Sequence, residues 1–186
     1  MNRPQEKPKS HQSTPCQTFT RVNYFTGQLL SPQDFTDEQN YFHEKLRRHN
    51  RSLHQPGVVD GLEISLETPD VRVAPGLALD AAGNEICVPV AQSAPLPSGP
   101  REVYVVLRYK EIGINPIPVP GTTGEGTTDC LPSRIQESFE IRFAPTGGTR
   151  PPTPPQDPSP PVRLARLRFT RGRWIVDARF RRPKAR

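Results

Sequence analysis

The spacing of apolar residues changes abruptly at Gly57, and this change constrains the fold more than any other feature of the chain. Before Gly57 the apolar residues recur with the period of a helix, whereas after it they alternate in short runs separated by glycines and prolines. The pattern predicts an α+β fold: a long N-terminal amphipathic helix, then a mainly antiparallel β-sheet or sandwich, with a proline-rich tail and linker.

The helix is predicted from about Pro32 to His54. Ser31 is a favourable N-cap, Pro32 suits the first helical position, and Asp34 places a negative charge at the positive end of the helix. The Pro-Gly pair that follows ends the helix. The expected apolar face carries Phe35, Phe42, Leu46 and Leu53.

The most hydrophobic predicted strand is residues 101–111. Val103, Val105 and Leu107 alternate with Tyr104 and Val106, so both faces are apolar and the strand is expected at the centre of the sheet. Further strands are expected near 59–66, 71–73, 77–79, 86–90 and 138–144, with a closing hairpin at 162–176 that turns at Gly172.

Clusters among the 24 prolines divide the chain, because they cannot belong to a packed core. The predicted parts are a disordered or extended N-terminal arm at 1–18, an aromatic lead-in and helix at 19–56, a β domain at 57–145 with a mobile loop at 113–132, a proline-rich linker at 146–161, and a basic C-terminal hairpin and tail at 162–186.

The sequence predicts synthesis and first folding in the cytoplasm. The polar segment from Met1 to Ser13 lacks the apolar region of a signal peptide, and no stretch is long and apolar enough to span a membrane. Cys16, Cys87 and Cys130 are odd in number and far apart, which argues against a disulfide framework.

The positive charge is concentrated at the C-terminal end. Residues 162–186 hold ten Lys or Arg against Asp177 alone, a balance of +9, whereas the preceding residues hold 15 basic and 18 acidic groups, a balance of −3. Nucleic-acid binding is one interpretation, but no fold signature supports it, so a solvated or protein-facing surface is favoured. Arg179, Arg181 and Arg182 are the predicted docking residues.

No catalytic, cofactor-binding or metal site is predicted. His43 and His54 could share a helix face with Glu44 nearby, but their spacing of eleven is not that of a ligand pair. Cys16 and Cys130 could meet around a zinc ion, although nothing in their spacing requires it. The chain also lacks the Gly-x-Ser-x-Gly elbow of a hydrolase and the lysine of a phosphate-binding loop. The sequence therefore favours a protein that is not an enzyme.

Several segments resemble a family of bacterial proteins found with phage-tail-like contractile injection systems. The resemblance covers roughly residues 19–182, and its central part also looks like the N-terminal attachment domains of phage tail fibres and baseplate proteins. It rests on RVNYFTGQLL at 21–30, the helix residues Asp34-Phe35 and Asp37-Glu38-Gln39, GVVDGL at 57–62, VAPGLALDAAGNEI at 73–86, CLPSRIQESFEI at 130–141, Leu164-Ala165 and Arg181-Arg182.

The resemblance implies a structural component located at or around a baseplate, mediating subunit attachment. Its partners would be other baseplate or tail subunits and further copies of itself in a symmetric ring, without nucleic acid, and the particle would be either released or surface-anchored. The alternative is a surface- or carbohydrate-binding β module of a tail-fibre-like receptor binder. Exposed aromatic platforms would favour that alternative, but Trp174 is the one tryptophan and is expected in the core.

Overall fold

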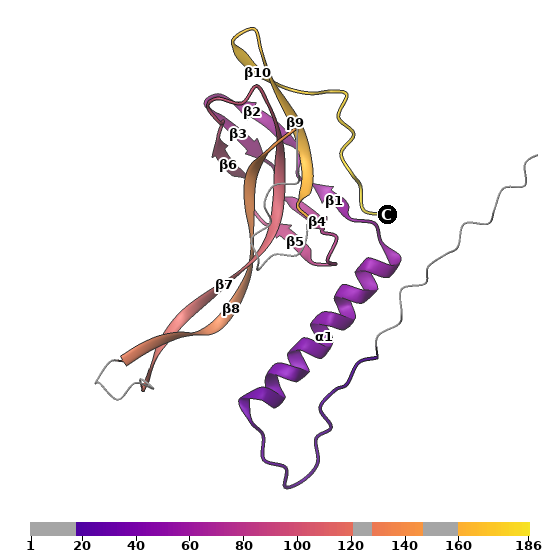
Figure 1. Cartoon of the computed structure of the whole chain (residues 1–186), viewed down its shortest axis with the longest axis vertical. Coiled ribbons are helices and arrows are strands. Elements are labelled where there is room, and N and C mark those ends of the chain that lie inside the picture. Colours follow the sequence, from indigo (N-terminus) through magenta and orange to yellow (C-terminus); the bar gives the residue numbers. More distant parts are fainter. Residues whose placement is uncertain (1–17, 121–127, 147–159) are drawn as a thin grey trace, which may run out of the picture. The chain divides into compact units, whose positions relative to one another are not determined.

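A computed structural model describes residues 18–120, 128–146 and 160–186 (Figure 1). The chain divides into two compact units, Met1–Lys45 and Leu46–Arg186, so that the helix contributes to both. We call the first the arm–helix unit and the second the β unit. The expected N-terminal arm, apart from Thr18, and the expected linker, apart from its ends, lie outside the described residues.

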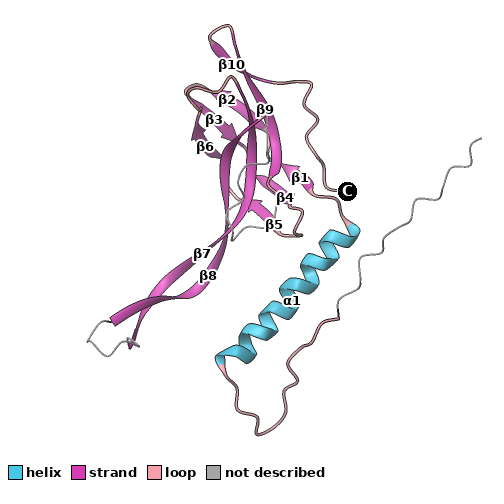
Figure 2. Cartoon of the chain, in the orientation of Figure 1, coloured by secondary structure: helices cyan, strands magenta, loops and turns pink. Residues whose placement is uncertain are grey.

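The fold is mainly β, which corrects the α+β class expected from the sequence. Of the described residues, 50% lie in strands and 15% in the single helix (Figure 2). The elements are α1 (Pro32–Leu53), β1 (Gly57–Gly61), β2 (Ile64–Glu67), β3 (Asp70–Val73), β4 (Gly76–Leu79), β5 (Glu85–Val88), β6 (Gln92–Pro95), β7 (Glu102–Pro120), β8 (Thr128–Pro145), β9 (Val162–Thr170) and β10 (Arg173–Val176).

The helix begins at the expected residue, Pro32, but the expectation of a long N-terminal amphipathic helix is wrong. Phe35, Phe42, Leu46 and Leu53 are each more than half exposed, and Asn50 is the one buried residue of α1. The correct periodicity therefore did not imply burial, because a helix face is buried only where a packing partner covers it.

Three antiparallel sheets make up the β unit. Their strand orders are β1-β4-β5, β2-β3-β6 and β10-β9-β7-β8. β7 pairs with both β9 and β8, which confirms that residues 101–111 form a central strand. Its register with β9 shifts between Val105 and Val106, whereas its register with β8 is continuous from Val103 to Pro120.

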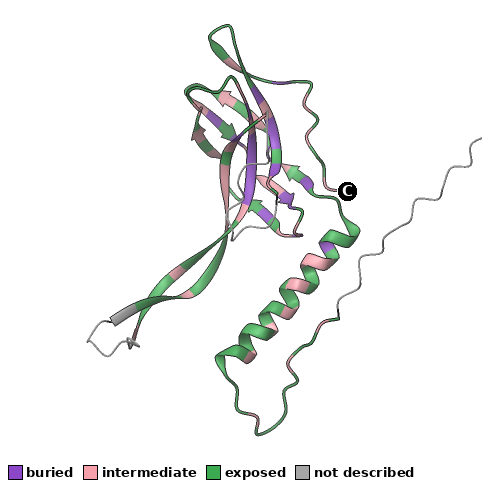
Figure 3. Ribbon diagram, viewed as in Figure 1, coloured by how far each residue is buried: buried purple, intermediate pink, exposed green. Residues whose placement is uncertain are grey.

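One hydrophobic core connects the sheets, and its buried residues lie in the strands, except for Leu62 between β1 and β2 (Figure 3). β7 supplies Val103, Val105 and Leu107, and β9 supplies Leu164 and Leu167. Further buried members are Val58, Leu62, Val71, Val73, Ala78, Ile86, Val88, Val162 and Ala165. Trp174 is half-buried against this core, as expected, whereas Val176 on the same strand is 39% exposed.

The loop expected over residues 113–132 is largely a pair of strands. β7 continues to Pro120 and β8 begins at Thr128, and each proline of this region pairs across the ladder. Prolines are compatible with a strand when their nitrogens face its open edge, which explains why strands occupy most of the expected loop. Residues 121–127 lie outside the described part of the chain.

The C-terminal tail runs beside β1 and forms what we call the C-terminal clasp, residues 182–185. The Val58 amide donates to the Pro183 carbonyl at 2.9 Å, and the Ala185 amide donates to the Val58 carbonyl at 3.0 Å. Gly57 allows this approach, because a Cβ there would lie 2.7 Å from the Pro183 carbonyl carbon. The Arg182 guanidinium donates to the carbonyls of Gly61 at 2.9 Å and Leu62 at 3.0 Å.

The clasp gives the first testable prediction. Replacing Arg182 by alanine should lower the free energy of unfolding by about 1–3 kcal/mol, because two backbone carbonyls lose a charged donor. Arg179→Ala is the control, since the side chain is exposed, and should change stability by less than about 0.5 kcal/mol. Urea unfolding measures both variants, and equal losses would contradict the clasp.

Candidate protein–protein interface

The lead-in to the helix folds back along it within the arm–helix unit. The Tyr24 hydroxyl donates to Glu38 Oε2 at 2.6 Å, which raises the pKa of Tyr24. The ring of Phe19 meets that of Tyr41 edge-on, with 6.2 Å between centroids. A turn with Gly27 at a φ of 89° reverses the chain between these contacts and the helix. The described lead-in, residues 18–31, is therefore held against α1 by side chains from both segments.

Ser31 and Asp34 form a reciprocal cap at the start of α1, as the sequence predicts. The backbone amide and hydroxyl of Ser31 both donate to Asp34 Oδ2 at 2.7 Å, and the Asp34 amide lies 3.3 Å from Ser31 Oγ. The hydrogen bond from the Ser31 backbone is the main cause that lowers the pKa of Asp34, followed by the Ser31 side chain. The carboxylate therefore stays charged where it stabilises the helix terminus.

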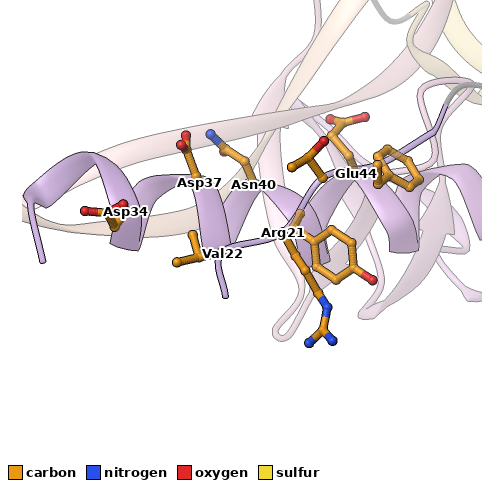
Figure 4. Close-up of a pocket in the computed structure, with 9 residues that line it drawn as sticks. Arg21, Val22, Asp34, Asp37, Asn40 and Glu44 are labelled. Carbon is orange, nitrogen blue, oxygen red and sulfur yellow. The ribbon is translucent and has the colours of Figure 1, made fainter. Parts of the chain in front are cut away.

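A groove of about 610 Å³ separates the lead-in from the helix (Figure 4). Asp37 and Asn40 project to one side of the helix, and Arg21 points to the other. The lining residues are Phe19, Thr20, Arg21, Val22, Asp34, Asp37, Asn40, Tyr41 and Glu44. This mixture of aromatic, acidic and amide groups suits polar contacts with another protein chain.

Large apolar side chains are exposed on the same unit. Leu29 is 94% exposed and Phe25 65% exposed, and Tyr24, Leu30, Phe35 and Phe42 are each more than 40% exposed. Exposed apolar groups that cluster on one element mark an interaction surface more often than single ones do. The lead-in and the first part of α1 therefore form the candidate interface.

In the β unit, a turn built on Asp80 holds the C-terminal part of the helix. The buried Asp80 carboxylate accepts from the amides of Ala82 and Asn84, each at 2.9 Å, and from the Asn84 side-chain amide at 2.8 Å. Gly83 adopts a φ of 88°, and a Cβ there would clash with the Arg47 carbonyl. Only glycine fits this position without strain.

Three side chains of α1 bind this turn. Arg47 donates to Asn84 Oδ1 at 2.6 Å, Asn50 to the Gly83 carbonyl at 2.9 Å, and Arg51 to the Ala82 carbonyl at 2.6 Å. An Asp-x-x-Gly spacing at 80–83 is a local signal for the turn, but nothing in the sequence identifies Asn50 as its partner. Arg47 also lies 3.7 Å from Glu111 of β7.

The basic C-terminal end is only partly available for docking. Arg166 and Arg168 contact Glu102 at 2.6 and 3.2 Å, and these contacts, with Arg166 as the main cause, lower the pKa of Glu102. Arg182 belongs to the clasp, which removes it from the predicted docking set. Arg179 and Arg181 remain exposed.

Histidine and cysteine residues do not form a ligand set in the described part of the chain. His54 lies beside His49, with 6.0 Å between ring centroids, rather than beside His43. Cys130 is exposed on β8, and Cys16 lies outside the described residues. Across residues 18–120, 128–146 and 160–186, no group of three potential metal ligands occurs, and no helix there is long and apolar enough to cross a membrane.

Solved structures similar to this chain come from type VI secretion baseplates. A chain in the cryo-electron microscopy structure of the type VI TssK-TssF-TssG baseplate subcomplex is 16% identical over 90% of this chain and 62% of its own, with a TM-score of 0.56. A chain in the type VI baseplate complex is 16% identical over 90% of this chain and 60% of its own, with a TM-score of 0.55. The chain in the crystal structure of TssK is 14% identical over 85% of this chain and 40% of its own, with a TM-score of 0.54.

The likeness at these identities is one of fold. The chain spans 40–62% of the length of these three structures. No protein-family model and no curated protein matches the sequence. The resemblance to tail-fibre attachment domains stays a prediction.

The turn that holds the helix gives the second prediction. Asp80→Ala should lower the free energy of unfolding by about 2 kcal/mol, because two half-buried backbone amides and the Asn84 side chain lose a charged acceptor. Asp60→Ala, at an exposed carboxylate on β1, is the matched control and should change stability little. Amide exchange should also speed up at Arg47–Arg51 in the Asp80 variant. Unchanged exchange there would show that the turn does not hold the helix.

Proposed function

We propose that this chain is a non-enzymatic structural component of a contractile, phage-tail-like injection particle, located at or around the baseplate and mediating subunit attachment. The observation that carries the proposal is the fold. It matches chains of two type VI baseplate complexes over 90% of its length, with TM-scores of 0.56 and 0.55. The sequence resemblance to proteins of contractile injection systems supports the same location.

The proposed partners are other baseplate or tail subunits. The lead-in and α1 offer apolar side chains and a groove with polar walls, which suits recognition by a helix or an extended segment of a neighbouring subunit. Side chains with shifted pKa values serve structural contacts: Asp34 caps the helix, and Glu102 pairs with two arginines. These uses support a structural role rather than catalysis.

A symmetric ring of copies is part of the proposal. The body of the chain is net negative and the C-terminal end strongly positive, which favours head-to-tail contacts between copies or with an acidic neighbour. Because Arg166, Arg168 and Arg182 are engaged within the chain, the basic end is better suited to a protein contact than to a phosphate backbone. The proposal therefore includes no nucleic-acid partner.

The function is tested by incorporation into particles. A tagged copy of the full chain, expressed from its own gene cluster, should co-purify with sheath and tube proteins. The double variant Phe25→Ser/Leu29→Ser should co-purify far less, because two exposed apolar contacts are lost. Val59→Ser/Val90→Ser is the control, since it removes two exposed apolar groups from the β unit. Intact particles that never contain the wild-type chain would refute the structural role.

The exposed arginines give a separate prediction. Arg179→Glu/Arg181→Glu should reduce incorporation, because a basic contact becomes repulsive towards an acidic neighbour. Arg171→Glu/Arg173→Glu introduces the same charge change at the exposed hairpin turn and should incorporate normally. Raising the salt concentration should weaken wild-type incorporation more than that of the 179/181 variant, since screening acts on the lost contact. Equal incorporation of both variants would remove the docking role of Arg179 and Arg181.

A further inference from the structure

β7 and β8 continue beyond the sheet as a two-stranded ribbon, which we define as residues 110–119 and 130–138. β9 pairs with β7 only from Glu102 to Leu107, and past this point the described residues of β7 and β8 pair with each other. Figure 1 shows the ribbon extending away from the rest of the β unit. At about 3.3 Å per residue its length is roughly 30 Å. An isolated two-stranded ribbon is marginally stable in water, so this one needs a cover.

One face of the ribbon continues the row of residues that fills the core. Because side chains alternate along a strand and paired residues point to the same side, the row of Val103, Val105 and Leu107 leads on to Ile117. Leu131 and Ile135 of β8 lie on this face too. The core residues of the row are at most 2% exposed, whereas Ile117, Leu131 and Ile135 are 50%, 56% and 63% exposed. We call this the inner face.

The opposite face, which we call the outer face, is also apolar. It carries Ile112, 40% exposed, together with Ile114, Pro116 and Pro132. Figure 3 shows the ribbon exposed along most of its described length. A ribbon with apolar residues on both sides needs two covers, one for each face.

The two faces carry opposite charges. Glu111 and Glu137 pair directly across the strands on the inner face, and like charges so placed are unfavourable unless a cation lies near them. The outer face carries Lys110 and Arg134, and the Arg134 side chain reaches the carbonyl of its neighbour Ser133. Arg47 lies 3.7 Å from Glu111, whereas no ion pair of the described residues involves Glu137. Stacking an inner face on an outer face therefore pairs acid with base.

The edges of the ribbon resist the addition of a further strand. Pro116 lies directly opposite Pro132, and Pro118 opposite Cys130. A proline has no N–H to give to the ladder, so each of these prolines turns its nitrogen to the open edge and leaves no donor there. The prolines therefore disfavour strand addition near the tip of the ribbon, where recognition through its faces is the better-suited mode.

We propose that the ribbon packs against the ribbons of two neighbouring copies of this chain, the inner face of one on the outer face of the next, and so closes a ring of three or more copies. The inference rests on the ring of copies in the proposed function and assigns its contact surface. A two-fold dimer would join a face to itself, which opposes acid with acid or base with base and leaves the second face uncovered. A head-to-tail ring covers both faces of every ribbon.

Mixing of single-face variants tests the arrangement. The full wild-type chain should have the mass of three or more copies in size-exclusion chromatography with light scattering. An inner-face variant, Ile117→Ser/Ile135→Ser, and an outer-face variant, Ile112→Ser/Ile114→Ser, should each be monomeric. Mixed together they should form a dimer and no larger species, because one intact inner face meets one intact outer face. The control Val59→Ser/Val90→Ser should keep the wild-type mass.

Charge reversals on the two faces distinguish loss of the contact from failure to fold. Glu137→Arg alone and Arg134→Glu alone should each weaken the ring, and the two combined in one chain should restore it. A monomeric wild-type chain, or single-face variants that each form dimers alone, would overturn the inference. Neither result bears on co-purification with sheath and tube, so failure of the ring and failure of the proposed baseplate role are distinguishable.

Discussion

The buried carboxylate of Asp80 is the constraint on which the start of the β unit depends. Its three hydrogen bonds shape a turn whose carbonyls at Ala82 and Gly83 face α1, and Arg51 and Asn50 bind these carbonyls. A buried carboxylate is tolerated only when such donors replace water. The same turn joins β4 to β5, so one side chain fixes both a strand connection and the end of the helix. The helix is thus held by polar contacts at one end rather than by an apolar face.

The clasp likewise satisfies backbone groups with hydrogen bonds, at the opposite edge of the β1-β4-β5 sheet. β1 would present an open edge to solvent, and open edges invite pairing with other chains. The C-terminal tail pairs with Val58, and Arg182 binds the two carbonyls at the sharp bend after β1, where Gly61 and Leu62 both have a φ of 60°. Gly57 lacks a Cβ that the tail would meet. Residues more than a hundred positions apart therefore complete one sheet.

The sequence predicts the positions of the helix and the central strand better than it predicts their burial and contacts. Ser31, Asp34 and the Pro-Gly pair gave the position of the helix, and the alternation at 101–111 gave the central strand, because both signals are local. Whether the apolar face of the helix is buried or exposed could not be predicted, since this depends on packing partners distant in sequence. The prolines at 116, 118 and 132 predict a loop, whereas in the structure they lie within the paired strands β7 and β8. The basic end was read as one surface, although the acidic partners Glu102 and Glu63 lie in other strands or loops.

The chain has two kinds of sheet surface: edges whose backbone groups are paired within the chain, and the ribbon, whose faces stay exposed. Where the chain can complete itself, as at β1, backbone groups are paired within the chain. At the ribbon, prolines remove three edge donors near the tip, while apolar and charged side chains are left exposed on both faces. A monomer gains little from that combination, because exposed isoleucines cost hydration free energy. The combination is stabilising only when another chain covers each face, which is what the proposed contact between ribbons supplies.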